Sequence, residues 1–216
     1  MSIINWILSS KEKRWYILNI TSFLILIIYI LYNCFLGLKY HLVWNISICM
    51  YYVLLLIIKA IIVINEVNIK NKETSIVAKK RKSVFYTTSI LLFVINIALI
   101  APIVLMALNK KSVELDIIAG IAVATYTTYK VIIAILNYVK NRQNENLAFR
   151  QLRTINLVDA ILSILTLQNT LISIAGSGEY DSMFPLVVLS SCAGVIIMLI
   201  LSIVPLVRVM RENKNK

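Results

Sequence analysis

Long uninterrupted runs of apolar residues dominate the chain, and short clusters of charged residues separate them. Six runs reach the length of about 20 residues that a membrane-spanning helix needs, and they lie near residues 15–38, 41–65, 83–109, 117–139, 154–175 and 182–207. The runs are continuous, whereas the strands of an outer-membrane barrel alternate between apolar and polar residues. A helix also pairs its backbone groups internally, as lipid requires. The sequence therefore predicts an all-α polytopic membrane protein with six transmembrane helices in a single domain, 1–216.

Lysine and arginine gather on one side of the predicted helices. They occupy the segment before the first run, the connections after the second and fourth runs, and the C-terminal tail. Basic residues are enriched in cytoplasmic connections. We therefore expect both termini in the cytoplasm, with three short outer connections near residues 39–41, 110–116 and 176–181.

Composition supports this class of protein. The chain is 60% hydrophobic and only 15% charged, against about 25% charged in a typical soluble domain. The net charge of +12 does not indicate nucleic-acid binding, because the basic residues lie in short connections between apolar runs. Isoleucine, lysine and asparagine are abundant, which is typical of an AT-rich bacterial genome, so we expect a location in the bacterial plasma membrane.

The familiar motifs of catalysis and metal binding are missing from the sequence. It contains no GxSxG, HExxH or Walker-type phosphate loop, and Gly176-Ser177-Gly178 is predicted to form a turn. The three cysteines lie within apolar runs without paired spacing, and His41 is the single histidine. We therefore expect neither an enzyme, nor a metal site, nor a bound cofactor.

Two consecutive runs each contain one ionisable residue well inside them, Lys130 in the fourth and Asp159 in the fifth. A charge in hydrocarbon costs roughly 2.5–3.5 kcal/mol on insertion scales. From the helical rise, Lys130 lies roughly 15 Å and Asp159 roughly 9 Å from the cytoplasmic boundary, and the long lysine stem can close this gap. We expect the two side chains to meet, either as a structural ion pair or as part of a binding site.

A third ionisable residue, Lys59, lies roughly 10 Å deep in the second run. Our preferred interpretation is that its flexible stem carries the ammonium group to the lipid headgroups. The alternative is a cluster with Lys130 and Asp159, whose net positive charge would hold an anionic ligand.

Polar residues continue along the helix that carries Asp159. Ser163, Thr166 and Thr170 follow it at +4, +7 and +11, which is one stripe of a helix. Gln168 lies opposite this stripe and Asn169 to one side. A helix with polar groups on several faces cannot easily face lipid, which predicts a central place for the fifth helix. Polar groups inside such bundles either line a cavity or form hydrogen bonds between helices. The residues that we expect to bind a ligand are Lys130, Asp159, Lys59, Tyr126, Asn137, Ser163, Thr166 and Asn96.

A basic cluster precedes the third run, in the predicted loop from Ile69 to Ser83. It consists of Lys79, Lys80, Arg81 and Lys82. The cluster either sets orientation alone or also binds anionic lipid headgroups, at about 1 kcal/mol per charge.

Three prolines lie within the third and sixth runs: Pro102, Pro185 and Pro205. Proline lacks the N–H that a helix interior uses. We therefore predict kinks in these two helices.

Two blocks resemble segments of uncharacterised multi-span bacterial integral membrane proteins. They are TYTTYKVIIAILNYVKNR at residues 125–142 and RTINLVDAILSILTLQNT at residues 153–170. The resemblance covers about a quarter of the chain and implies a bacterial membrane protein without any particular activity.

Two functions remain open on these grounds. The first is a small membrane transporter, channel or ligand-binding subunit, with a polar site between the fourth and fifth helices that takes a small anionic ligand. The second is a non-transporting membrane protein, such as a regulator, assembly factor or immunity component, that works through a protein partner and uses its ion pair only for structure. A water-accessible void at Lys130 would favour the first function, and a closed, dry contact would favour the second.

Overall fold

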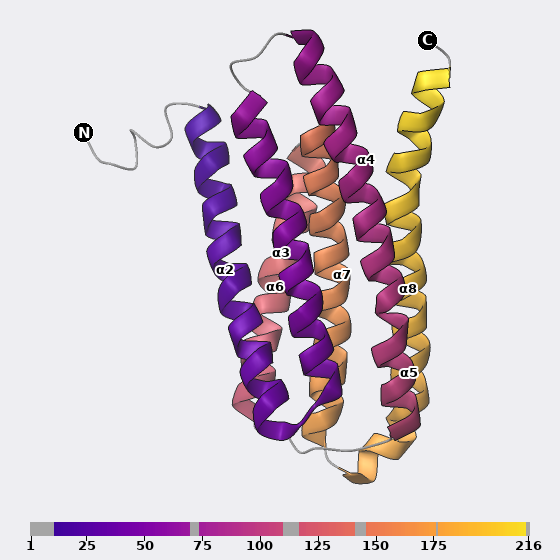
Figure 1. Ribbon diagram of the computed structural model, residues 1–216. Coiled ribbons are helices and arrows are strands. Elements are labelled where there is room, and N and C mark those ends of the chain that lie inside the picture. The colour runs from indigo at the N-terminus through magenta and orange to yellow at the C-terminus, as the bar shows by residue number, and fades with distance from the viewer. Residues whose placement is uncertain (1–10, 70–73, 110–116, 141–145, 176, 215–216) are drawn as a thin grey trace, which may run out of the picture.

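The computed structural model describes residues 11–69, 74–109, 117–140, 146–175 and 177–214, which are helical apart from short turns (Figure 1). The helices run alternately in opposite directions through one bundle, and α5 continues the course of α4. Helix α2 begins and α8 ends at the same end of the bundle (Figure 1), which we call the terminal end, the opposite end being the distal end. The helices are α2 (Lys11–Tyr40), α3 (Val43–Ile69), α4 (Thr74–Ala98), α5 (Ile100–Asn109), α6 (Ile117–Lys140), α7 (Leu147–Ala175) and α8 (Ser177–Lys214).

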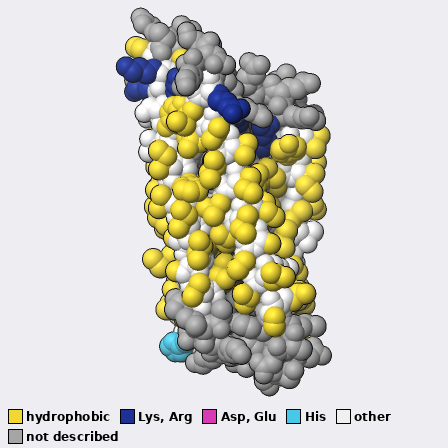
Figure 2. All heavy atoms as spheres, turned by 90° about the vertical axis from the view of Figure 1, so that its right-hand side faces the viewer, with side chains coloured by type: hydrophobic (Ala, Val, Ile, Leu, Met, Phe, Trp, Pro, Cys, Tyr) yellow, Lys and Arg dark blue, Asp and Glu magenta, His cyan; other side chains and the backbone are white. Residues whose placement is uncertain are grey.

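Six segments of the described chain are helices long and apolar enough to span a membrane. Large apolar side chains remain exposed on several helices, and on the face shown in Figure 2 they cover its middle, while lysine and arginine side chains gather toward the terminal end. The predicted all-α class and the six apolar helices are confirmed, which suggests a multi-pass membrane protein. The six segments are Thr21–Tyr40, Val43–Ile69, Ile76–Val104, Ile117–Val139, Leu147–Ile172 and Pro185–Arg211.

Helix α7 occupies the centre of the bundle. It packs against α3, α4, α6 and α8, while α2 packs on α3 and α4 packs on α8. A larger share of α7 is buried than of any other described span. The central place that polar residues on several faces predicted for this helix is therefore confirmed.

Several helices extend beyond the apolar runs that predicted them. Helix α4 already begins at Thr74, so the basic cluster lies in its first turns and not in the predicted loop. Helix α8 begins at Ser177, so the turn predicted at Gly176-Ser177-Gly178 is wrong for Ser177 and Gly178, while Gly176 lies outside the described residues. The connection predicted over residues 110–116 also lies outside them. Hydropathy marks only the apolar part of a helix, whereas lysine, arginine and glutamate continue helical hydrogen bonding equally well.

The third predicted span is interrupted close to its proline. Helix α4 ends at Ala98 and α5 begins at Ile100, with Pro102 in the first turn of α5. Because proline has no N–H, it cannot bond to the carbonyl of Ala98 four residues earlier. The interruption agrees with the kink predicted there, whereas α8 continues through Pro185 and Pro205.

A tight turn joins α2 to α3 at the distal end. His41 has a positive φ of 52°, and the Leu42 N–H donates to the Gly37 carbonyl at 3.1 Å, which is the bonding of a Schellman helix end. A Cβ atom on Gly37 would lie 2.7 Å from Cγ1 and 3.0 Å from the backbone N of Ile46. The close approach of the two helices therefore depends on this glycine.

The first prediction concerns Gly37→Ala. Alanine usually stabilises a helix relative to glycine by about 0.5–1 kcal/mol, but here we expect the free energy of unfolding to fall by about 1–3 kcal/mol, because the new methyl group meets the Ile46 backbone. Thermal unfolding in detergent, followed by circular dichroism, measures the effect. Gly120→Ala is the matched control, since its Cβ meets only the movable Cδ1 of Ile174. A higher melting temperature for Gly37→Ala would contradict the expected clash.

Candidate functional site

Three charged side chains from three helices meet inside the bundle: Lys59 of α3, Lys130 of α6 and Asp159 of α7, which we call the triad. The Nζ atom of Lys130 donates to Asp159 Oδ2 at 2.6 Å, and the Nζ atom of Lys59 donates to the same oxygen at 3.0 Å. The predicted contact between Lys130 and Asp159 is confirmed. The preferred interpretation of Lys59 was wrong, because its ammonium group is turned inward and not toward the surface.

The helix bounds explain why the three residues lie at one height. Lys59 and Lys130 each lie roughly 15 Å from the terminal end of their helices, and Asp159 roughly 18 Å from the start of α7. The sequence analysis counted the depth of Asp159 from Arg153, whereas α7 already begins at Leu147, so the distance of Asp159 from the start of its helix was underestimated. The lysine stems therefore have little difference in depth to bridge.

The triad is closed to its surroundings. Asp159 is 0% exposed, Lys59 3% and Lys130 5%, so water-accessible surface is nearly absent at the charged groups. Among the described residues, the structure therefore shows a closed contact at Lys130 and not a water-accessible cavity. With both lysines protonated and the aspartate ionised, the triad carries one net positive charge.

Hydrogen bonds around Ser163 connect the same three helices. Its hydroxyl donates to the backbone carbonyl of Asp159 at 2.7 Å and lies 3.2 Å from the hydroxyl of Tyr52 on α3. Thr127 of α6 donates to the backbone carbonyl of Ser163 at 3.0 Å. Thr166 donates to a carbonyl of its own helix at 2.9 Å. Ser163 therefore supports the triad, whereas the hydroxyl proton of Thr166 is used within α7.

Tyrosine rings from three helices form one side of the triad. The Nζ atom of Lys130 lies 5.2 Å from the ring centre of Tyr126, a distance typical of cation–π attraction. The Tyr126 ring stacks on Tyr29 of α2, with 3.5 Å between ring centres, and Tyr29 meets Tyr52 edge to face at 5.1 Å. The sequence analysis predicted Tyr126 but missed Tyr29 and Tyr52. The spacing of seven residues between Tyr52 and Lys59, which places both on one face of α3, was the available signal for Tyr52.

Some buried polar atoms beside this arrangement have no hydrogen-bond partner among the described residues. They are Asp159 Oδ1 and the hydroxyls of Tyr29 and Tyr126. Buried polar groups are almost always paired, so each exception asks for an explanation. A metal ion is not the explanation that the residues favour, because no cluster of three His, Cys, Asp or Glu occurs in the described part of the chain.

Two of the predicted site residues lie away from the triad. Asn96 accepts a hydrogen bond from Tyr51 at 2.7 Å and donates to Ser202 at 2.7 Å and to the Met198 carbonyl at 3.2 Å. It therefore joins α3, α4 and α8, with its amide fully used. Asn137 is partly exposed and lies two turns, roughly 10 Å, along α6 from Lys130. Asn137 shares a face of α6 with Lys130, but it does not reach the triad because it lies two turns away along the helix.

A second polar cluster lies toward the terminal end. Arg81 of the basic cluster forms a two-pronged ion pair with Glu66 of α3, in which Nε lies 3.0 Å from Oε2 and Nη2 contacts Oε1. Asn146 donates to Glu66 at 3.1 Å and accepts from the Ala148 N–H at 3.0 Å, capping the start of α7. Arg81 is thus held by protein, whereas Lys79 is exposed.

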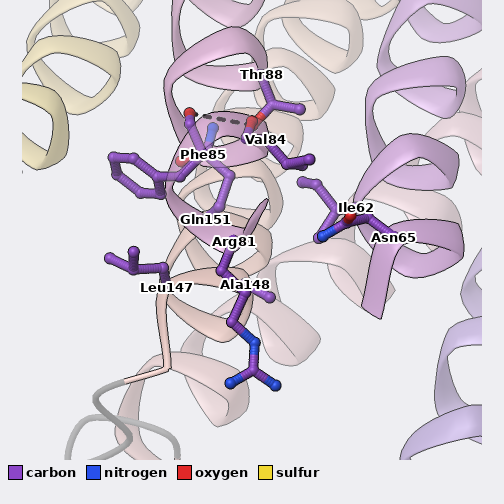
Figure 3. A pocket seen from close by; sticks show the side chains of 9 residues that line it. All are labelled: Ile62, Asn65, Arg81, Val84, Phe85, Thr88, Leu147, Ala148 and Gln151. Atoms are coloured by element: carbon purple, nitrogen blue, oxygen red, sulfur yellow. Dashed lines mark hydrogen bonds between the residues drawn. The ribbon is translucent and has the colours of Figure 1, made fainter. Parts of the chain in front are cut away.

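A small recess lies beside this cluster, between α3, α4 and α7 (Figure 3). It has room for about one water molecule. Gln151 lines it and accepts a hydrogen bond from Ser89 at 3.1 Å, while its Nε2 is buried without a partner among the described residues. The recess lining is Ile62, Asn65, Arg81, Val84, Phe85, Thr88, Leu147, Ala148 and Gln151.

The second prediction compares two changes in the triad. Asp159→Asn leaves two buried ammonium groups without a carboxylate, and we expect the free energy of unfolding to fall by about 3–5 kcal/mol. Lys59→Met keeps one neutral pair and replaces the stem by a similar volume, so we expect little loss or a gain. Unfolding in mixed micelles, followed by tryptophan fluorescence, measures both. Equal losses in the two variants would show that the charge balance does not govern stability.

The third prediction concerns Glu66 and Arg81. A double-mutant cycle of Glu66→Gln and Arg81→Gln should give a coupling energy of about 1–2 kcal/mol, because the pair is two-pronged and only partly exposed. Lys79→Gln serves as the control on the same helix and should change stability by less than about 0.5 kcal/mol. The same unfolding measurement applies, and a coupling energy near zero would mean that the pair does not tie α3 to α4.

No protein-family model, curated protein or solved structure matches the chain. The resemblance expected for residues 125–142 and 153–170 therefore has no counterpart in these comparisons. Function must therefore be inferred from the triad and its surroundings.

Proposed function

We propose that the chain is a small integral membrane protein of the transporter, channel or ligand-binding class, which binds a small anionic solute at Lys59, Lys130 and Asp159. The closed contact at Lys130 by itself favours a structural role. The second lysine is the observation that outweighs it and supports this proposal. A structural lock needs one cation and one anion, whereas a second buried ammonium group adds a desolvation cost of several kcal/mol and leaves the charge unbalanced. Ionisable groups at such places are functional candidates by default, and an anion would restore the balance.

In this proposal the structure represents the closed state of the site. Both ammonium groups converge on one oxygen of Asp159, which holds them at the spacing that an incoming anion would meet. The anion competes with Asp159 for the hydrogen bonds of Lys59 and Lys130. Its entry requires α3 to separate from α6 and α7, since these helices supply the three charges.

The membrane setting is part of the same proposal. We place the six apolar helices across the plasma membrane of a bacterium, with both termini in the cytoplasm, because basic residues favour that side. The basic side chains that gather toward the terminal end in Figure 2 support this orientation. Lys79, Lys80 and Lys82 would then face anionic lipid headgroups, with Arg81 held by Glu66 as a weaker contributor.

We propose no enzymatic activity. Nucleophilic catalysis needs a hydroxyl, thiol or amine beside a base. The hydroxyl of Ser163 donates to a backbone carbonyl instead of a base, and both lysines, 3% and 5% exposed, are closed to a substrate.

A second candidate function draws its support from the closure of the triad. A regulator, assembly factor or immunity component would need these charges only to fix the helices in place, and buried ion pairs can serve that purpose. The near-zero exposure of Asp159, Lys59 and Lys130 suits such a role. The ligand of such a chain would be another protein and not a solute.

The fourth prediction separates the two functions. Under the first, at least one anion among chloride, acetate and sulfate should raise the melting temperature of the purified protein in detergent, because a bound anion stabilises the folded state. Lys130→Met should weaken that response at least tenfold. Under the second, the anions have no specific effect, a protein partner co-purifies, and the charge-swapped Lys130→Asp, Asp159→Lys variant recovers folding. An anion response of unchanged strength in Lys130→Met would contradict the proposed site.

A further inference from the structure

We infer that the ligand of this site is a single monovalent anion, which is bound while Asp159 remains in place. The inference rests on the proposed function and adds the charge and stoichiometry of the ligand. It depends on three observations: the charge count of the triad, the confinement of Asp159, and the unpartnered polar atoms beside it.

The net charge of the triad determines the charge of the anion that it binds. Two lysines and one aspartate share the same buried region, which leaves one positive charge when both lysines are protonated and the aspartate is ionised. The cost of burying net charge in a low-dielectric region rises steeply with its magnitude, because little solvent screens it. One monovalent anion brings the region to neutrality. A divalent anion would leave one negative charge, which is no better balanced than the empty site.

The negative charge of Asp159 cannot leave the buried region through a movement of its side chain. It lies well inside α7 with 0% exposure, and α7 packs against four other helices. A change of rotamer would move the carboxylate only by about the length of the side chain and would not bring it to the surface. Its negative charge therefore stays in the same region as an incoming anion, whether or not its hydrogen bonds are exchanged.

The surroundings of the triad suit a small anion. The two ammonium groups converge on one oxygen atom at 3.0 Å and 2.6 Å, a geometry that a halide or one carboxylate oxygen can reproduce. The hydroxyls of Tyr126 and Tyr29, 9% and 3% exposed, have no partner among the described residues. A phenol hydroxyl can donate to an anion without adding charge. The site thus offers charged and neutral donors together, with one charge left to compensate.

A series of variants that differ in the net charge of the triad tests the inference. The net charge of the triad is +1 in the wild type, zero in Lys59→Met, +2 in Asp159→Asn and again +1 in the double variant Lys59→Met, Asp159→Asn. Melting temperatures are measured in detergent against sodium chloride and sodium sulfate at equal ionic strength, so that Lys59→Met reports non-specific salt effects.

The expected pattern follows the charge. Chloride should stabilise the wild type and the double variant, with an apparent affinity at least tenfold higher than in Lys59→Met, and sulfate should not exceed the effect seen in Lys59→Met. Sulfate should become the stabilising anion in Asp159→Asn. If Asp159→Asn does not fold, the double variant, which carries one buried positive charge like the wild type, supplies the comparison with Lys59→Met.

The outcomes separate the inference from the proposed function. Stabilisation of the wild type by sulfate but not by chloride would overturn the monovalent ligand and leave the anion site standing. An equal chloride response in wild type and Lys59→Met would overturn the charge argument. If no variant responds to either anion, the proposed function fails together with the inference.

Discussion

One carboxylate oxygen holds the middle of this bundle together. Oδ2 of Asp159 accepts hydrogen bonds from lysines on α3 and α6, and so ties α7 to both helices at one height. Removing charged groups from water costs several kcal/mol per ion, and only close pairing offsets that cost. The central place of α7 and the tyrosine rings beside Lys130 keep the contact dry, so the packing and the charge contact depend on each other.

The polar residues of the bundle fall into two groups. Asn96 uses its amide oxygen and nitrogen in bonds to α3 and α8, which is how a polar group serves packing between helices. Asp159 accepts hydrogen bonds from both lysines at Oδ2. Its other oxygen, Oδ1, has no partner among the described residues. The residues look alike as polar positions in an apolar sequence, and only their bonding distinguishes a satisfied structural contact from a site with unused capacity.

The sequence carried enough information for the helices and for the contact between Lys130 and Asp159. Hydropathy identifies apolar helices directly, and consecutive antiparallel helices are natural neighbours. It did not place Lys59, because that contact joins residues 100 positions apart and a single sequence does not say which face of α3 meets α7. For an isolated lysine, extension of the flexible stem to the lipid headgroups was the preferred interpretation. The polar turns at the start of α4 were missed because hydropathy does not register helical residues outside the apolar runs.

The separation of 100 residues between Lys59 and Asp159 also has a consequence for biogenesis in the proposed membrane setting. Ribosomes add about 5–20 residues per second, so α3 would enter the bilayer roughly 5–20 s before its carboxylate partner is synthesised. During that interval the lysine stem would reach for the headgroups, and the arrival of α7 would draw it inward. Translation order would thus make the fifth span the step that completes the triad, and a chain truncated before it would present a distinct target for membrane quality control.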